Sequence, residues 1–133
     1  LYLREYLLRL YEGIKGLEIT EDLVIERINN LSETMTDEFR GILHNERFRI
    51  GVSQKLINLF LKYLWVLNLI NEPPYCPFDS IVKRNLTNNN LVDWTKLDNT
   101  EDYMKFVDAA KEVAAPLSIA VWELETWNRN VIL

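Results

Sequence analysis

The sequence predicts an all-α fold, a single compact domain with a buried helix at its centre and about five to seven helices in all. Three observations predict this fold. A threonine followed by two acidic residues, a pattern typical of helix starts, recurs at residues 20–22, 36–38 and 100–102. Apolar residues recur at helical spacing, and no run alternates long enough to favour a sheet. Of the 133 residues 48% are hydrophobic, which is enough to form one core.

The N-terminal helices are predicted within residues 1–50. A first helix covers residues 1–11, where leucine and tyrosine side chains repeat at helical spacing, and glycines end it. Thr20 caps the second helix, because its hydroxyl accepts from a free N–H group and the acids that follow suit the positive end of the helix dipole. Thr36 predicts the start of a third helix by the same rule.

The central helix and the C-terminal helices are predicted within residues 51–133. Residues 52–70 form the central helix, which the three prolines of residues 73–77 stop. The boundaries of the later helices are marked by Asp79 or Ser80, Thr100 and Pro116. Because the connections are short, residues 1–133 are expected to form one domain.

A polar stripe runs along the apolar central helix. Gln54, Asn58 and Lys62 drift by only about 40° per step along one face of a helix. Lys55 lies beside Lys62 on the same arc, and Trp65 continues it. Amide and ammonium donors suit an anionic or carbonyl-bearing ligand, so one hypothesis is a pocket or partner surface with aromatic walls.

A structural interpretation of the stripe stands beside that hypothesis. The lysines can reach water along an exposed edge of the helix. Alternatively, Gln54 and Asn58 can bond loop backbone that has no other partner. Because polar stripes on helices are mostly solvated faces, the structural interpretation is the favoured one.

Three groups of residues form a pattern. They are G-x-x-Q-K-x-x-N-x-x-x-K-Y-L at residues 51–64, C-P-F-D-S at residues 76–80, and W-T-K-L-D at residues 94–98 followed by Tyr103. Together with P-L and W-E-x-x-x-W near the C-terminus, this pattern resembles a helical family of uncharacterised bacterial and phage proteins. The resemblance covers residues 50–128 and implies a small helical domain without an assigned activity. The residues that it marks are Gln54, Lys55, Asn58, Lys62, Asp79 and Trp94.

The charge balance argues against nucleic-acid binding. The net charge is −5, whereas the affinity of a nucleic-acid binder comes from basic groups that neutralise phosphates. Residues 51–90 are a mildly basic exception, with four basic and two acidic side chains. Residues 51–70 are apolar enough to suggest a membrane span, but two lysines, a glutamine and an asparagine at its N-terminal and middle positions make insertion costly, so no span is expected.

The sequence predicts no metal and no cofactor. Cys76 is the only cysteine and His44 the only histidine, which excludes an intrachain disulfide and a Cys/His zinc site. No P-loop, dinucleotide-binding glycine pattern or nucleophile elbow is found. A lone cysteine fits a reducing compartment, and the charged N-terminus lacks a signal-peptide pattern, so we expect a cytoplasmic location.

Asp93 and Asp98 place two carboxylates near Trp94 in a predicted loop. A metal site or an acid/base pair is one interpretation of this pattern. Bonding to local backbone is the favoured one, because aspartates in loops commonly form such turns.

The sequence favours a non-enzymatic helical binding module of phage or prophage origin, without a catalytic residue and with a protein partner or a second copy of itself. The candidate ligand or partner residues are Gln54, Lys55, Asn58, Lys62, Trp65, Asp79 and Trp94. One alternative is a small hydrolase or nucleotide-directed enzyme with a pocket around Lys55, Asn58 and Asp79. A second alternative is a nucleic-acid-binding domain that uses the basic middle segment.

Overall fold

Six α-helices make up the fold in the computed structural model, which describes residues 2–88 and 90–132, with side chains described as far as residue 127. They are α1 (Tyr2–Ile14), α2 (Glu21–Phe39), α3 (Ile50–Val66), α4 (Ser80–Arg84), α5 (Thr100–Ala114) and α6 (Ile119–Ile132). Short 3₁₀ turns cover Arg40–Ile42, His44–Glu46 and Trp94–Lys96. The described residues contain no β-strand, so the predicted all-α class is confirmed.

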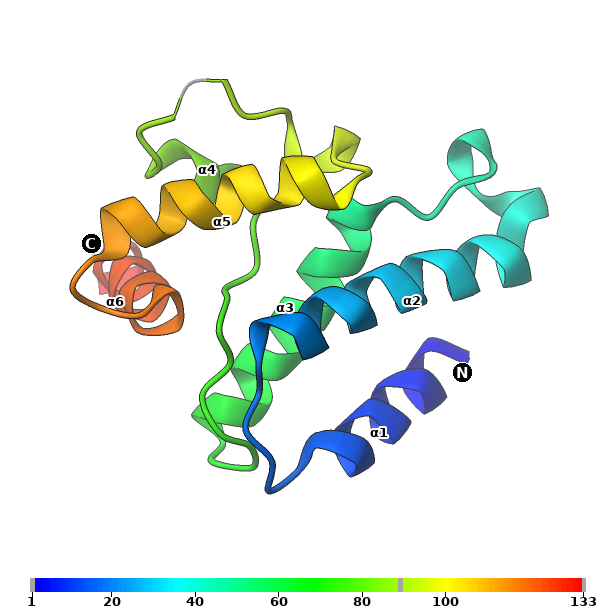
Figure 1. The fold of residues 1–133 in the computed structure, drawn as a ribbon, viewed down its shortest axis with the longest axis horizontal. Coiled ribbons are helices and arrows are strands. Elements are labelled where there is room, and N and C mark those ends of the chain that lie inside the picture. The colour runs from blue at the N-terminus through cyan, green and yellow to red at the C-terminus, as the bar shows by residue number, and fades with distance from the viewer. Residues whose placement is uncertain (1, 89, 133) are drawn as a thin grey trace.

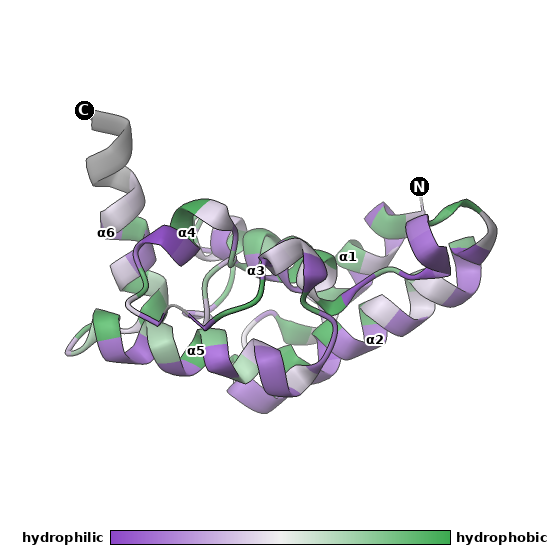
Figure 2. Cartoon of the chain, turned by 90° about the horizontal axis from the view of Figure 1, so that it is seen from above, coloured by the Kyte–Doolittle hydropathy of each residue, from purple (hydrophilic) through white to green (hydrophobic). Residues whose placement is uncertain are grey.

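The helix α3 lies at the centre of the fold (Figure 1). It packs against α2 on one side, and against α5 and the turn Trp94–Lys96 on the other. Hydrophilic and hydrophobic residues mix along α2 and α5 in Figure 2, as expected of helices that cover a core with one face. The core contains, among others, Ile28, Leu31, Ile57, Leu61, Phe106 and Val107.

The helix α2 has the predicted cap but not the predicted end. The Thr20 hydroxyl accepts from the N–H of Leu23 at 3.2 Å. The predicted helix start at Thr36 is wrong, because α2 continues through this residue to Phe39. Thr36 is buried, and its hydroxyl donates to the carbonyl of Ser32 at 2.7 Å and accepts from the N–H of Phe48 at 3.0 Å. A hydroxyl satisfied in this way ties α2 to the segment that follows it.

The helix α3 begins at Ile50 and ends at Val66, four residues before the predicted end. Asn68 lies in the left-handed region with φ of 61°, and the N–H of Leu69 donates to the carbonyl of Leu64 at 2.8 Å. This is the Schellman motif, in which a residue with positive φ closes the last turn of a helix. Asparagine tolerates that conformation better than most residues, so Asn68 ends the helix although apolar residues continue beyond it.

The starts of α4 and α5 both depend on a side-chain cap. The Asp79 carboxylate accepts from the N–H of Val82 at 2.9 Å, as predicted. The cap of α5 is Asn99, whose side-chain oxygen accepts from the N–H of Asp102 at 2.7 Å, so the predicted position at Thr100 is wrong by one residue. Thr100 instead pairs with the side chain of Asn29 in α2 at 3.2 Å.

An extended segment, residues 71–79, returns from the end of α3 through the middle of the molecule (Figure 1). Tyr75, Cys76 and Phe78 are buried in it. The rings of Tyr75 and Phe78 pack edge to face with Tyr103 of α5, with centroids 5.6 and 5.9 Å apart. The segment is therefore part of the core although it has no regular secondary structure.

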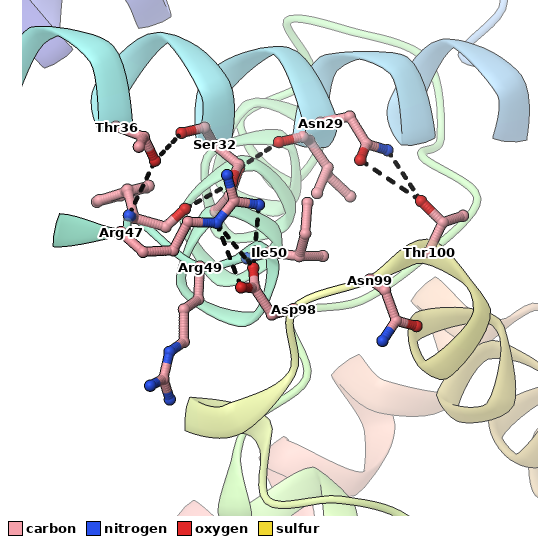
Figure 3. Close-up of polar contacts among 12 residues, drawn as sticks. Asn29, Ser32, Thr36, Arg47, Arg49, Ile50, Asp98, Asn99 and Thr100 are labelled. Atoms are coloured by element: carbon pink, nitrogen blue, oxygen red, sulfur yellow. Dashed lines mark hydrogen bonds and ion pairs between the residues drawn. The ribbon is translucent and has the colours of Figure 1, made fainter. Parts of the chain in front are cut away.

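A polar junction joins the N-termini of α3 and α5 to α2 (Figure 3). The Asp98 carboxylate accepts from the N–H of Ile50 at 3.1 Å and from Nε of Arg47 at 3.1 and 3.2 Å. Beside it, the Ser32 hydroxyl of α2 donates to the carbonyl of Phe48 at 2.5 Å. These bonds satisfy backbone groups in front of α3 and fix where that helix begins.

Gly51 lets the turn Trp94–Lys96 touch α3. Its N–H donates to the carbonyl of Leu97 at 2.7 Å. A Cβ at this position would lie 1.8 Å from the carbonyl oxygen of Trp94, which is backbone and cannot move aside locally. The position therefore accepts only glycine.

We expect Gly51→Ala to lower the free energy of unfolding by about 3 kcal/mol or more, because the added methyl group forces two backbones apart. Chemical denaturation of the purified variant measures this change. Gly13→Ala is the control, since a Cβ at Gly13 in α1 meets nothing within 4 Å. It is expected to be neutral or to stabilise by up to about 1 kcal/mol. Equal stability of the two variants would contradict the assigned contact.

Candidate functional site

The predicted polar stripe of α3 divides into a half that is buried in the core and a half that lines a groove. Gln54 and Asn58 are fully buried. Lys55 and Lys62 line a groove. Trp65, the fifth residue of the predicted stripe, packs against the hydrophobic core instead.

Gln54 binds the backbone of the extended segment. Its Nε2 donates to the carbonyl of Phe78 at 2.6 Å, and its Oε1 accepts from the N–H of Phe78 at 3.1 Å. An extended chain inside the core has peptide groups that need partners, and a carboxamide offers both a donor and an acceptor. Gln54 therefore has the structural role of holding loop backbone.

Asn58 continues this network to α5. Its Nδ2 donates to Oε1 of Gln54 at 3.2 Å and to the hydroxyl of Tyr103 at 3.1 Å. Burial raises the pKa of Tyr103 well above its usual value, so the hydroxyl stays protonated at neutral pH. Oδ1 of Asn58 accepts no hydrogen bond from the described part of the chain. The network connects α3, the extended segment and α5.

A groove with a cavity volume of about 440 Å³ lies between α3, α4 and α6, and is called the α3–α6 groove below. Its size falls in the range of ligand pockets. Four of its apolar side chains, Tyr63, Val66, Ile81 and Trp127, are between 46% and 57% exposed. The described residues that line it are Lys55, Leu59, Lys62, Tyr63, Val66, Pro77, Asp79, Ile81, Val82, Asn85, Trp122, Glu123, Leu124, Thr126 and Trp127.

An ion pair crosses the groove from α3 to α6. Nζ of Lys62 lies 2.9 Å from each carboxylate oxygen of Glu123. The two side chains are only 14% and 7% exposed. The ring of Trp127, four residues after Glu123, lies with its centroid 5.3 Å from the same ammonium group. The charge of Lys62 is thus matched inside the protein, and the pair fixes α6 to α3.

Lys55 is held more loosely at the other side of the groove. Its Nζ lies 3.9 Å from Oδ2 of Asp79, which is longer than a hydrogen bond. The ammonium group also lies 4.7 Å from the centroid of the Trp94 ring. The side chains of Lys55 and Asp79 are 36% and 25% exposed, so water reaches both.

The structure brings together part of the predicted enzyme site. Lys55 and Asp79 both line the α3–α6 groove, whereas Asn58 belongs to the buried network behind it. Cys76 is buried, and this burial raises the pKa of its thiol, which keeps the thiol protonated. Asp93 accepts from the N–H of Thr95 at 2.9 Å, a local turn of the kind favoured for it.

The sequence did not predict the contacts of Glu123 and Trp127 with Lys62, nor the hydrogen bonds of Tyr103 and Asp98. The contacts of Glu123 and Trp127 were predictable in part, because residues four apart on a helix lie on the same face and can contact one partner. The hydrogen bonds of Tyr103 and Asp98 were not, since their partners Asn58 and Ile50 are more than forty residues away in the chain.

The chain matches no protein-family model, and comparisons with curated proteins and with solved structures gave no match. The resemblance of residues 50–128 to a helical family therefore stays a prediction. No helix in the described ranges is both long and apolar enough to cross a membrane. The same residues contain no group of three metal-binding side chains.

We expect Gln54→Met to lower the free energy of unfolding by about 2–4 kcal/mol, because the N–H and the carbonyl of Phe78 then lack partners in the core. Asn85→Ala is the control, since this exposed amide follows α4 and donates to the carbonyl of Ile81, four residues earlier. Its effect should stay within about 0.5 kcal/mol. Denaturant titration compares the two, and similar losses would remove the role given to Gln54.

We expect Lys62→Met to lower the free energy of unfolding by about 3 kcal/mol, because it leaves the Glu123 carboxylate buried without a counter-charge. The double variant Lys62→Met/Glu123→Leu should regain most of this loss, since neither charge then remains. Thermal and denaturant unfolding measure both variants. A double variant no more stable than Lys62→Met would show that the lost stability came from packing.

Proposed function

We propose that this chain is a non-enzymatic helical binding module and that the α3–α6 groove binds an apolar segment of a partner protein. The observation that carries the proposal is the exposure of Tyr63, Val66, Ile81 and Trp127 around one cavity of about 440 Å³. Large apolar side chains gathered in this way are typical of interaction sites, whereas single exposed ones are ordinary.

The character of the groove supports binding of a protein segment. Its apolar side chains come from three helices, and aromatic rings are prominent among them, as in the centres of protein interfaces. Lys62 and Glu123 already neutralise each other, so a segment entering the groove does not have to match those charges.

A second candidate function is a small hydrolase or nucleotide-directed enzyme. The approach of Lys55 to Asp79, at 3.9 Å and in contact with the groove, favours it. It would have to work without Asn58, whose amide is engaged by Gln54 and Tyr103. We rank it second because the apolar lining needs no reaction to explain it.

Selection from a phage-displayed random-peptide library on the full chain tests the binding function. We expect enriched peptides whose affinity falls at least about tenfold on Val66→Glu, because the new charge lies in the apolar groove. Leu8→Glu is the matched control, since Leu8 is also a half-exposed apolar residue on a helix but lies in α1, away from the groove. Circular dichroism verifies that both variants fold.

Two results would contradict the binding function. One is a library that yields no enriched peptide. The other is a set of peptides that lose as much affinity on Leu8→Glu as on Val66→Glu.

A further inference from the structure

The charges around the α3–α6 groove differ from those of the chain as a whole. The net charge is −5, but residues 51–90 contain four basic and two acidic side chains. Two of the four basic residues, Lys55 and Lys62, line the groove. The other two, Lys83 and Arg84, belong to α4, the helix that forms one wall. The described lining also contains Asp79 and Glu123, so its charges balance, whereas the chain as a whole is acidic.

Of the two groove lysines, Lys55 has the greater hydrogen-bonding capacity to spare. Lys62 is bonded to both oxygens of Glu123 and is largely buried. The ammonium group of Lys55 lies 3.9 Å from the nearest oxygen of Asp79. It also lies over the ring of Trp94, and this contact is electrostatic and occupies none of the three N–H donors of Lys55. Lys55 is thus a positioned cation whose donors are open to a ligand.

Asp79 does not compete strongly for those donors. Its Oδ1 accepts from the N–H of Val82 as the cap of α4, and only Oδ2 faces Lys55. An incoming carboxylate at hydrogen-bond distance would bind the ammonium group better than Asp79 does at 3.9 Å, because charge-assisted hydrogen bonds form at about 2.7–2.9 Å.

We propose, resting on the binding function above, that the partner segment is amphipathic and acidic: its apolar side chains fill the α3–α6 groove, and a carboxylate next to them binds Lys55. The charge complementarity of Lys55 selects this occupant over a neutral or basic segment, because the other groove lysine, Lys62, is already matched by Glu123. The apolar contacts supply affinity, and Lys55 fixes the register of the segment.

Parallel library selections test the proposal. On the wild-type chain, peptides that depend on the groove should be enriched in Asp or Glu beside their apolar residues. On Lys55→Met, which keeps the length of the side chain and removes its charge, groove-dependent peptides should still appear but without this enrichment. Lys83→Met is the matched control, because it removes a charge from α4 at a position outside the groove lining, and it should retain the acidic preference.

The tightest wild-type peptide then serves as the calorimetric probe. Replacing its acidic residue by the corresponding amide should weaken binding about tenfold to the wild type and hardly at all to Lys55→Met. Asp79→Asn should have the opposite sign, strengthening binding of the acidic peptide about threefold, because asparagine still caps α4 but no longer competes for Lys55. A role of Lys55 in folding alone would not produce that gain.

The two proposals fail in different ways. Groove-dependent peptides without an acidic preference would overturn the role of Lys55 and leave the binding function standing. A lack of groove-dependent peptides on the wild type would overturn both. Self-association of the full chain that Val66→Glu abolishes, measured by light scattering, would assign the groove to a second copy and overturn the acidic partner.

Discussion

The pairing of the Gln54 carboxamide with the backbone of Phe78 is the interaction on which the rest of the structure depends. Residues 71–79 cross the core as an extended chain without a neighbouring strand, so their peptide groups need partners from side chains. One carboxamide satisfies both polar groups of Phe78. Asp79 follows directly and caps α4, so the position of α4, and with it one wall of the groove, depends on this bond.

Four residues on one side of α3 connect this helix to the rest of the molecule. Gly51 admits the turn Trp94–Lys96, Gln54 binds the extended segment, Asn58 reaches α5, and Lys62 reaches α6. Each of these residues therefore contacts a different part of the C-terminal half. These directional contacts fix the rotation of α3 about its axis and its position along that axis. The residues of α3 that line the groove are therefore held rigidly.

The sequence predicted the elements that local chemistry determines. Helical spacing identified the principal helices, and the caps at Thr20 and Asp79 follow from neighbouring residues. The errors came from competing interactions. Thr36 has the composition of a cap, but Ser32 and Phe48 engage its hydroxyl, and Asn68 ends α3 by adopting a left-handed conformation within an apolar run.

The stripe itself was predictable from the periodicity of α3. Its division into a buried hydrogen-bonded half and a half that lines the groove was not. Phe78 binds Gln54 in the core, and Glu123 binds Lys62 in the groove. Both residues reach α3 only once the chain has folded. The groove needs α3, α4 and α6 in place together, and no local pattern encodes the arrangement of three helices.

The way in which α6 is attached affects how the sequence of this protein can evolve. The helix packs against α5 and is fixed to α3 by the Lys62–Glu123 pair, while the central core lies mainly among α2, α3 and α5. Residues of α6 such as Leu124 and Trp127 line the groove without belonging to that core. If the groove binds a partner as proposed, mutations there would alter the specificity of binding at little cost in folding, because those residues lie outside the core.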